Sequence, residues 1–178
     1  MQEPFSRIIR VDTLPKDGET VTIEATPPER EALAAVLKLP SIERLSATLT
    51  VKRAAKGGAR VIGAVHGELT QTCVVTLEPF PAAVEEEIDV RFAPREDEHA
   101  GRRPTDEPET VSMADDDEPD PIVDGKIDLG ALAAEFFALG LDPYPRKDGV
   151  AFEQPAEPEA EAEATPFAVL RGARNKGE

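Results

Sequence analysis

The sequence is poor in the residues that most often carry chemistry or stacking. Its 178 residues include one cysteine, two histidines, one tyrosine and no tryptophan. A single cysteine excludes an intrachain disulfide, and scarce aromatic residues leave little material for stacking on nucleobases. The chain has no run of about 20 apolar residues, as a membrane-spanning helix needs, and its start shows no signal-peptide pattern. We therefore expect a cytoplasmic protein with no membrane partner.

Basic residues are outnumbered, and the acidity is unevenly placed. The chain has 20 Lys and Arg against 36 Asp and Glu, a net charge of −16. Residues 94–124 hold 12 acids and 3 bases, and residues 153–164 hold 5 acids and no base, which leaves a net charge of only −2 for the rest. This distribution argues against a protein that coats nucleic acid by charge, so we expect no DNA partner.

Several segments alternate apolar and polar residues, as half-buried strands of an antiparallel sheet do. Lys56-Gly57-Gly58 and residues 78–81 are predicted turns between such segments. Cys73 shares its parity with Val75 and Leu77, which predicts that all three face the core, whereas Glu86 interrupts an apolar face and indicates an edge strand. The predicted strands are residues 6–12, 20–25, 44–52, 60–70 with an extension over 72–77, and 84–92.

Two helices carry clear end signals. Thr26 and Glu29 form a capping box before a helix that runs to about Lys38. Asp128 is a good N-cap and Gly140 a good stop for a second helix. Its apolar stripe is formed by Leu129, Leu132, Ala133 and Phe136. Phe137 lies off the stripe, so either the stripe is wide or Phe137 meets a second surface.

These signals predict an α+β fold with a mostly antiparallel sheet, open or barrel-like, and two packed helices. Residues 1–93 form a β-rich core with one helix. Residues 94–121 form an acidic disordered loop. Residues 122–152 add the docking helix and an extended exit to the same domain. Residues 153–178 are an acidic linker followed by a short apolar anchor at 166–171.

Three segments in a fixed order carry a family resemblance over residues 60–176. The positions that carry it are Gly67, Cys73, Leu77, Glu78, Phe92, Asp128, Leu129, Glu135, Leu139, Leu141, Pro143, Pro166, Phe167 and Leu170. The chain resembles the YceD family of bacterial large-subunit ribosomal RNA accumulation proteins, which has plastid relatives. Many members carry Arg and a second Cys where this chain has Val75 and Thr76. The resemblance implies a role in synthesis, processing or stability of large-subunit rRNA, and it supplies no catalytic residue.

Two sets of residues are candidates for binding. Basic residues around one predicted hairpin are candidates for contact with RNA phosphate, the alternative being a solvated hairpin tip: Lys52, Arg53, Lys56 and Arg60. A second set is a candidate partner contact on and after the docking helix: Glu135, Phe137, Pro143, Tyr144 and Pro145. Glu135 is equally explained by a salt bridge to the sheet.

The residues that could carry catalysis have simpler interpretations. Cys73 is either a nucleophile or a small buried hydrophobic residue, and a dyad with His66 or His99 would arise only by accident of folding. The run Asp115 to Glu118 would hold divalent ions weakly, without a fixed geometry, so a solvated linker explains it better. We expect no catalytic, metal or cofactor site.

Three functions follow in order of preference. The first is a non-catalytic accessory protein that binds precursor large-subunit (23S) rRNA or a ribosome assembly protein. The second is a protein-only adaptor whose acidic tracts and Pro143-Tyr144-Pro145 segment recruit a basic ribosomal or assembly partner. The third is a carboxylate-based hydrolase, which needs two converging acids with separated pKa values.

Overall fold

The computed structural model describes residues 4–94 and 119–151. The chain divides into two compact units, residues 1–148 and 149–178, and the first holds every helix and strand that is described. Its elements in chain order are β1 (Ile8–Arg10), the 3₁₀ turn η1 (Val11–Thr13), β2 (Glu19–Glu24), α1 (Pro27–Leu37), β3 (Ser41–Arg53), the 3₁₀ turn η2 (Ala55–Gly57), β4 (Ala59–Thr72), β5 (Pro79–Pro94), β6 (Asp120–Ile122), β7 (Lys126–Asp128) and α2 (Leu129–Leu139).

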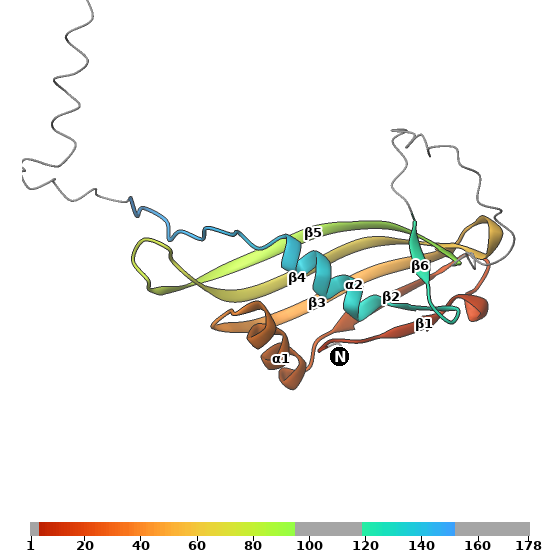
Figure 1. Cartoon of the computed structure of the whole chain (residues 1–178), viewed down its shortest axis with the longest axis horizontal. Coiled ribbons are helices and arrows are strands. Elements are labelled where there is room, and N and C mark those ends of the chain that lie inside the picture. Colours follow the sequence, from red (N-terminus) through yellow and green to blue (C-terminus); the bar gives the residue numbers. More distant parts are fainter. Residues whose placement is uncertain (1–3, 95–118, 152–178) are drawn as a thin grey trace, which may run out of the picture. The chain divides into compact units, whose positions relative to one another are not determined.

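A five-stranded sheet in the order β2-β3-β4-β5-β6 forms the body of the first unit (Figure 1). The long strands β3, β4 and β5 pair antiparallel, whereas β6 joins β5 in parallel at residues 92–94. A separate pair, β1 with β7, brings the N-terminal strand beside the start of α2. Among the described strands β2 pairs only with β3 and β6 only with β5, so this sheet is open.

Alternation along the strands gives the sheet an apolar inner face and a polar outer face. On β3, Leu45, Leu49 and Val51 are fully buried, while residues 46, 48 and 50 between them are half-buried or exposed. The core also takes side chains from both helices, among them Leu33, Leu132, Ala133 and Phe137. The inner face is therefore covered, and the outer face is open to solvent over the described residues.

Helix α2 is fixed at its start by a cap and at its middle by a close approach to the sheet. The Asp128 carboxylate accepts hydrogen bonds at 3.0 and 3.1 Å from two N–H groups of the first turn. It also accepts one at 2.7 Å from the backbone N–H of Arg7. The Phe137 ring lies where a side chain at residue 67 would be, because a Cβ on Gly67 would come within 2.3 Å of Phe137 Cε2.

The N-terminal residues connect α1 to α2. The Arg7 guanidinium donates to both carboxylate oxygens of Glu29 on α1, at 2.7 and 2.9 Å, and it lies 4.9 Å from the centre of the Phe5 ring. Hydrogen bonding to Arg7, helped by donors on Thr26 and opposed by desolvation, lowers the pKa of Glu29 from 4.5 to about 2. Phe5 itself is buried, so this segment is part of the core's cover.

The α+β class with two helices and a mostly antiparallel sheet is confirmed, but the sheet does not close into a barrel. One strand prediction was wrong: β4 ends at Thr72, and residues 74–76 form a turn. Leu77 adopts a φ of 59° after this turn and is 76% exposed instead of facing the core. The predicted turn at 78–81 instead begins β5, where an edge position tolerates Pro79 and Pro81.

The predicted acidic loop ends slightly earlier than expected, because residues 120–122 pair with β5 as β6. A three-residue strand carries no alternation that a sequence pattern could reveal. Most of that loop (residues 95–118), the linker at 153–164 and the segment at 166–171 lie outside the described residues.

Candidate functional site

Three basic side chains form a row across the outer face, at the end of the sheet nearest the β3–β4 hairpin. The strand register pairs Lys52 with Arg60 and Arg60 with Arg91, and all three residues are exposed. Neighbouring strands lie about 4.8 Å apart, and like charges directly opposite each other destabilise a sheet. These residues, which we call the cationic row, therefore repel one another in the isolated protein.

One carboxylate lies within the cationic row. Arg60 Nε and Nη2 donate to the two oxygens of Asp89 at 2.7 and 2.6 Å. Hydrogen bonding to Arg60 lowers the pKa of Asp89, and the positive charges of Arg60 and Arg91 lower it further, although desolvation opposes them. Asp89 is thus ionised at neutral pH and offsets part of the positive charge of the row. The pair is about half exposed, so it contributes little to stability and mainly orients Arg60.

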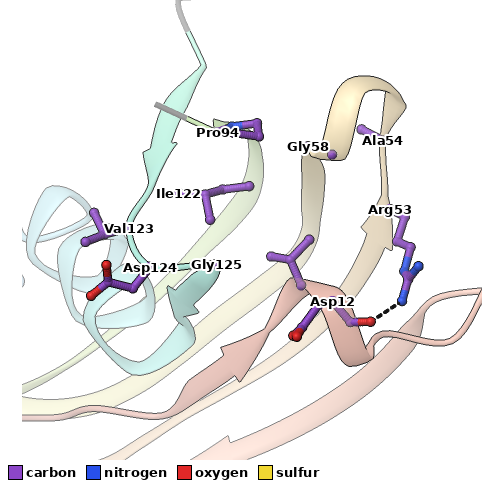
Figure 2. Close-up of a pocket in the computed structure, with 11 residues that line it drawn as sticks. Asp12, Arg53, Ala54, Gly58, Pro94, Ile122, Val123, Asp124 and Gly125 are labelled. Carbon is purple, nitrogen blue, oxygen red and sulfur yellow. Dashed lines mark hydrogen bonds between the residues drawn. The ribbon is translucent and has the colours of Figure 1, made fainter. Parts of the chain in front are cut away.

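The four basic residues predicted to contact RNA do not form one patch. Lys52 and Arg60 come together in the cationic row, and Lys56 lies exposed at the hairpin tip with a φ of 56°. Arg53 has the opposite parity, and its Nη2 donates to the backbone oxygen of Asp12 at 2.6 Å, as Figure 2 shows. Sequence reasoning missed Arg91, although the alternation of its strand places it on the outer face.

A cavity of about 610 Å³ lies beside the same hairpin (Figure 2). Its lining comes from η1, the hairpin, the end of β5 and the β6–β7 turn. Asp12 and Asp124 lie on different segments that border the cavity, as Figure 2 shows. Asp12 already forms an ion pair with Arg10 at 2.8 Å, and hydrogen bonding to Arg10 lowers its pKa. The hollow therefore offers mainly an apolar wall between two separate carboxylates.

The residues predicted to contact a partner have different surroundings. Glu135 and Pro143 are exposed, and Tyr144 is 71% exposed. Pro145 is half-buried, and its carbonyl accepts a hydrogen bond from the Val74 N–H at 2.9 Å. Phe137 has no exposed surface. Its place in the predicted contact surface was wrong, because a glycine on β4 lets the ring sink into the core.

The thiol of Cys73 is fully buried, in line with its interpretation as a structural residue. The backbone N–H of Lys147 lies 3.5 Å from its Sγ. This hydrogen bond and those from Thr76, opposed by desolvation, lower the pKa of Cys73 to about 6. The segment that follows α2 thus interacts with the thiol through the Lys147 backbone.

Two further searches give plain results for the part of the chain that the structure describes. It contains no group of three or more His, Cys, Asp or Glu side chains placed to hold a metal ion. None of its helices combines the length and the apolar character needed to cross a membrane.

The chain was compared with known proteins. No curated protein and no solved structure gives a significant match. A family model described as "Large ribosomal RNA subunit accumulation protein YceD" matches residues 61–172, well over half of the chain. The matched part begins within β4 and includes Arg91, β5 and α2, whereas Lys52 and Arg60 precede it. The extent of this match shows that the chain belongs to the YceD family.

Proposed function

We propose that this protein is a non-catalytic accessory factor that supports the accumulation of large-subunit (23S) rRNA by contacting precursor rRNA through the cationic row. The observation that carries the proposal is the register of Lys52, Arg60 and Arg91, which sets three basic residues side by side on an open sheet face. Phosphates of an RNA strand relieve the repulsion within such a row. Membership of the family supports the link to large-subunit rRNA.

The chemistry of the row favours contact with the RNA backbone. Arg60 is held in place by Asp89, while Lys52 supplies a point charge on a flexible stem. No aromatic residue stands in the row, so stacking on bases has no platform there. Phosphate contacts position a protein without reading sequence, and we therefore expect salt-dependent binding with weak sequence preference.

The double variant Lys52→Glu with Arg91→Glu tests this contact and leaves the Arg60–Asp89 pair in place. We expect its affinity for fragments of large-subunit rRNA to fall by tenfold or more, because two attractive contacts become repulsive. The dependence of log affinity on log salt should become shallower by about 1.4, or about 0.7 for each lost phosphate contact. Fluorescence anisotropy at several salt concentrations measures both quantities.

The matched control is Arg44→Glu, on the outer face near the other end of β3. Arg44 is exposed and meets Glu24 only at 3.8 Å, so its reversal should leave RNA affinity within about twofold of wild type. Thermal unfolding of each variant establishes that the fold is intact. Unchanged RNA affinity in a folded double variant rejects the proposal.

We propose a protein-only adaptor as the second candidate function. The observation in its favour is an exposed apolar group beside the exit from α2. Tyr144 is 71% and Leu77 is 76% exposed, and the hydrogen bond from Val74 to Pro145 joins their segments. The acidic tracts assigned to this adaptor lie outside the described residues. A tagged pull-down with and without RNase separates the functions: partners that survive RNase support the adaptor, and partners lost with RNase support the RNA contact.

A further inference from the structure

Strand β5 presents a long open edge. On one side, β5 pairs with β4 along nearly its whole length. On the other side, the described part of the chain supplies only β6, which pairs with residues 92–94. Alternate residues between 80 and 90 therefore turn backbone N–H and C=O groups toward a side on which no described strand accepts them. Figure 1 shows β5 along one margin of the sheet, with α2 lying next to it. Such an edge is a template for one more strand.

Helix α2 makes this edge one wall of a groove. A cavity of about 430 Å³ extends around the β5 edge, from Asp89, Val90 and Arg91 to the flank of α2. Phe136 is half-buried on that flank, and Leu139 is 71% exposed. An added strand would find backbone pairing with β5 and apolar contact with α2. A strand edge beside a helix is a geometry that captures extended peptides, with side-chain pockets at alternate positions.

Carboxylates predominate along the β5 edge next to this cavity, whose own lining also includes Arg60 and Arg91. Glu85, Glu86 and Glu87 are consecutive on β5, and none of them takes part in an ion pair within residues 4–94 and 119–151. Glu85 and Glu87 point to the exposed outer side. A strand paired beside β5 would place its own outward side chains next to these two carboxylates.

The C-terminal end of α2 adds to the same negative field. The last turn of α2 contains no basic residue, although the carbonyls at a helix C-terminus favour a cation. Glu86 packs against this end, since a Cβ on Gly140 would lie 2.5 Å from Glu86 Cγ. Glu135 also lines the groove. This end of the groove therefore favours a ligand that brings its own positive charge.

We propose that the groove between β5 and α2 binds an extended basic segment of a partner protein, added as a strand to the open edge. In this arrangement, apolar side chains face Phe136 and Leu139, and alternate lysines or arginines face Glu85 and Glu87. A second copy of the chain fits poorly, because pairing two β5 edges would oppose the same carboxylates. The inference does not rest on the RNA contact, although Arg60 and Arg91 of the cationic row also line this cavity; the peptide therefore engages the Glu85–Glu87 part of the edge. Apart from Arg60, the residues that line the groove lie within the part of the chain that the family model matches.

A labelled peptide of about ten residues, the length of a long strand, is the probe. It alternates lysine with valine or leucine, and a second peptide has the same composition with the lysines grouped at one end. We expect the full-length protein to bind the alternating peptide at least about tenfold more tightly than the grouped peptide. Only the alternating peptide can direct its lysines toward the β5 carboxylates and its apolar side chains toward α2. The double variant Glu85→Lys with Glu87→Lys should lose about tenfold in affinity. Leu139→Ser should weaken binding by about threefold, since a partly exposed side chain loses its contact.

The control is Glu19→Lys, the same type of substitution at one position of β2, on the opposite edge of the sheet, and it should bind like wild type. Peptides N-methylated at alternate amides test backbone pairing directly: one methylation register should abolish binding and the other should spare it. Equal binding of the alternating and the grouped peptide, equal tolerance of both methylation registers, or unchanged affinity in a folded Glu85/Glu87 variant overturns the proposal. Binding of β5 by a second copy, detected as a dimer by light scattering that the Glu85/Glu87 variant loses, also overturns it.

Discussion

The inner and outer faces of the sheet are made by the same strands but are held in place by different forces. Leu49 and Val61 on the inner face have no exposed surface, so their removal from water contributes to folding. On the outer face, Thr20 and Thr50 share a hydrogen bond of 2.9 Å at an exposed position, and the cationic row remains in water. The comparison teaches that stability and binding are separable in this protein: inner-face changes should alter unfolding, and outer-face changes should alter partners.

The largest expected effect is on the inner face, where Phe137→Ala removes the ring that covers Gly67. Phe137 is fully buried, and truncation of a buried Phe to Ala typically costs about 3–5 kcal/mol. Because α2 packs on β5, β4 and β3, we expect a single cooperative transition at lower denaturant concentration. Urea unfolding followed by far-UV circular dichroism measures the change.

A double-mutant cycle with Gly67→Val identifies the contact as the cause. Gly67→Val alone should destabilise the protein, because its Cβ would overlap the ring. Combined with Phe137→Ala, the new side chain occupies part of the vacated space, so the double variant should be more stable than the sum of the two single changes. Strictly additive losses would show that Phe137 does not pack on residue 67.

An intermediate effect is expected for the ion pair between Arg7 in the N-terminal segment and Glu29 on α1, which helps to fix α1 over the inner face. Glu29→Gln removes the charge that Arg7 binds and should cost about 1 kcal/mol at neutral pH for a bidentate, partly exposed pair. The pKa of Glu29 is lowered by folding, so the stabilisation is complete above pH 4.5. It is lost as the pH falls from 4.5 to about 2. Urea unfolding of both proteins between pH 7 and 3, within the window set by these pKa values, should show the difference shrinking with acid.

The control for this titration is Glu31→Gln, an exposed residue on the same helix. Its stability should remain within about 0.5 kcal/mol of wild type at neutral pH. A wild-type advantage over Glu29→Gln that stays constant down to pH 3 would contradict the role of the Arg7–Glu29 pair.

Much of the fold could be predicted from the sequence, because the two faces of the sheet appear as an alternation of apolar and polar residues along each strand. Alternation over 44–52 predicted β3, and Asp128 with Gly140 predicted both ends of α2. The turn before β5 could not be predicted in this way. Leucine rarely adopts a left-handed backbone conformation, so the sequence gives no sign of one at Leu77. Leu77 adopts it because backbone hydrogen bonds from Cys73 N–H to Glu78 and from Leu77 N–H to Cys73 close the turn.

The candidate sites required information that one strand does not contain. Lys52 and Arg60 flank a glycine turn and were found from the sequence, but Arg91 joins them only through the register of β4 with β5. Phe137 was misplaced because helix periodicity does not show that a glycine on another strand lets a second flank of α2 sink into the core. The open edge of β5 is likewise a property of pairing.

The smallest expected effect sharpens the comparison at two adjacent positions of β3. Thr48→Ala changes an exposed outer-face residue whose side chain meets Thr22 at 3.3 Å, and we expect a loss of about 0.5 kcal/mol or less in urea unfolding. Leu49→Ala, on the inner face, should cost about 2–5 kcal/mol. Strand propensity falls in both variants, so the contrast isolates burial. Similar losses at both positions would mean that the outer face is also covered, and the cationic row would then be unavailable to RNA.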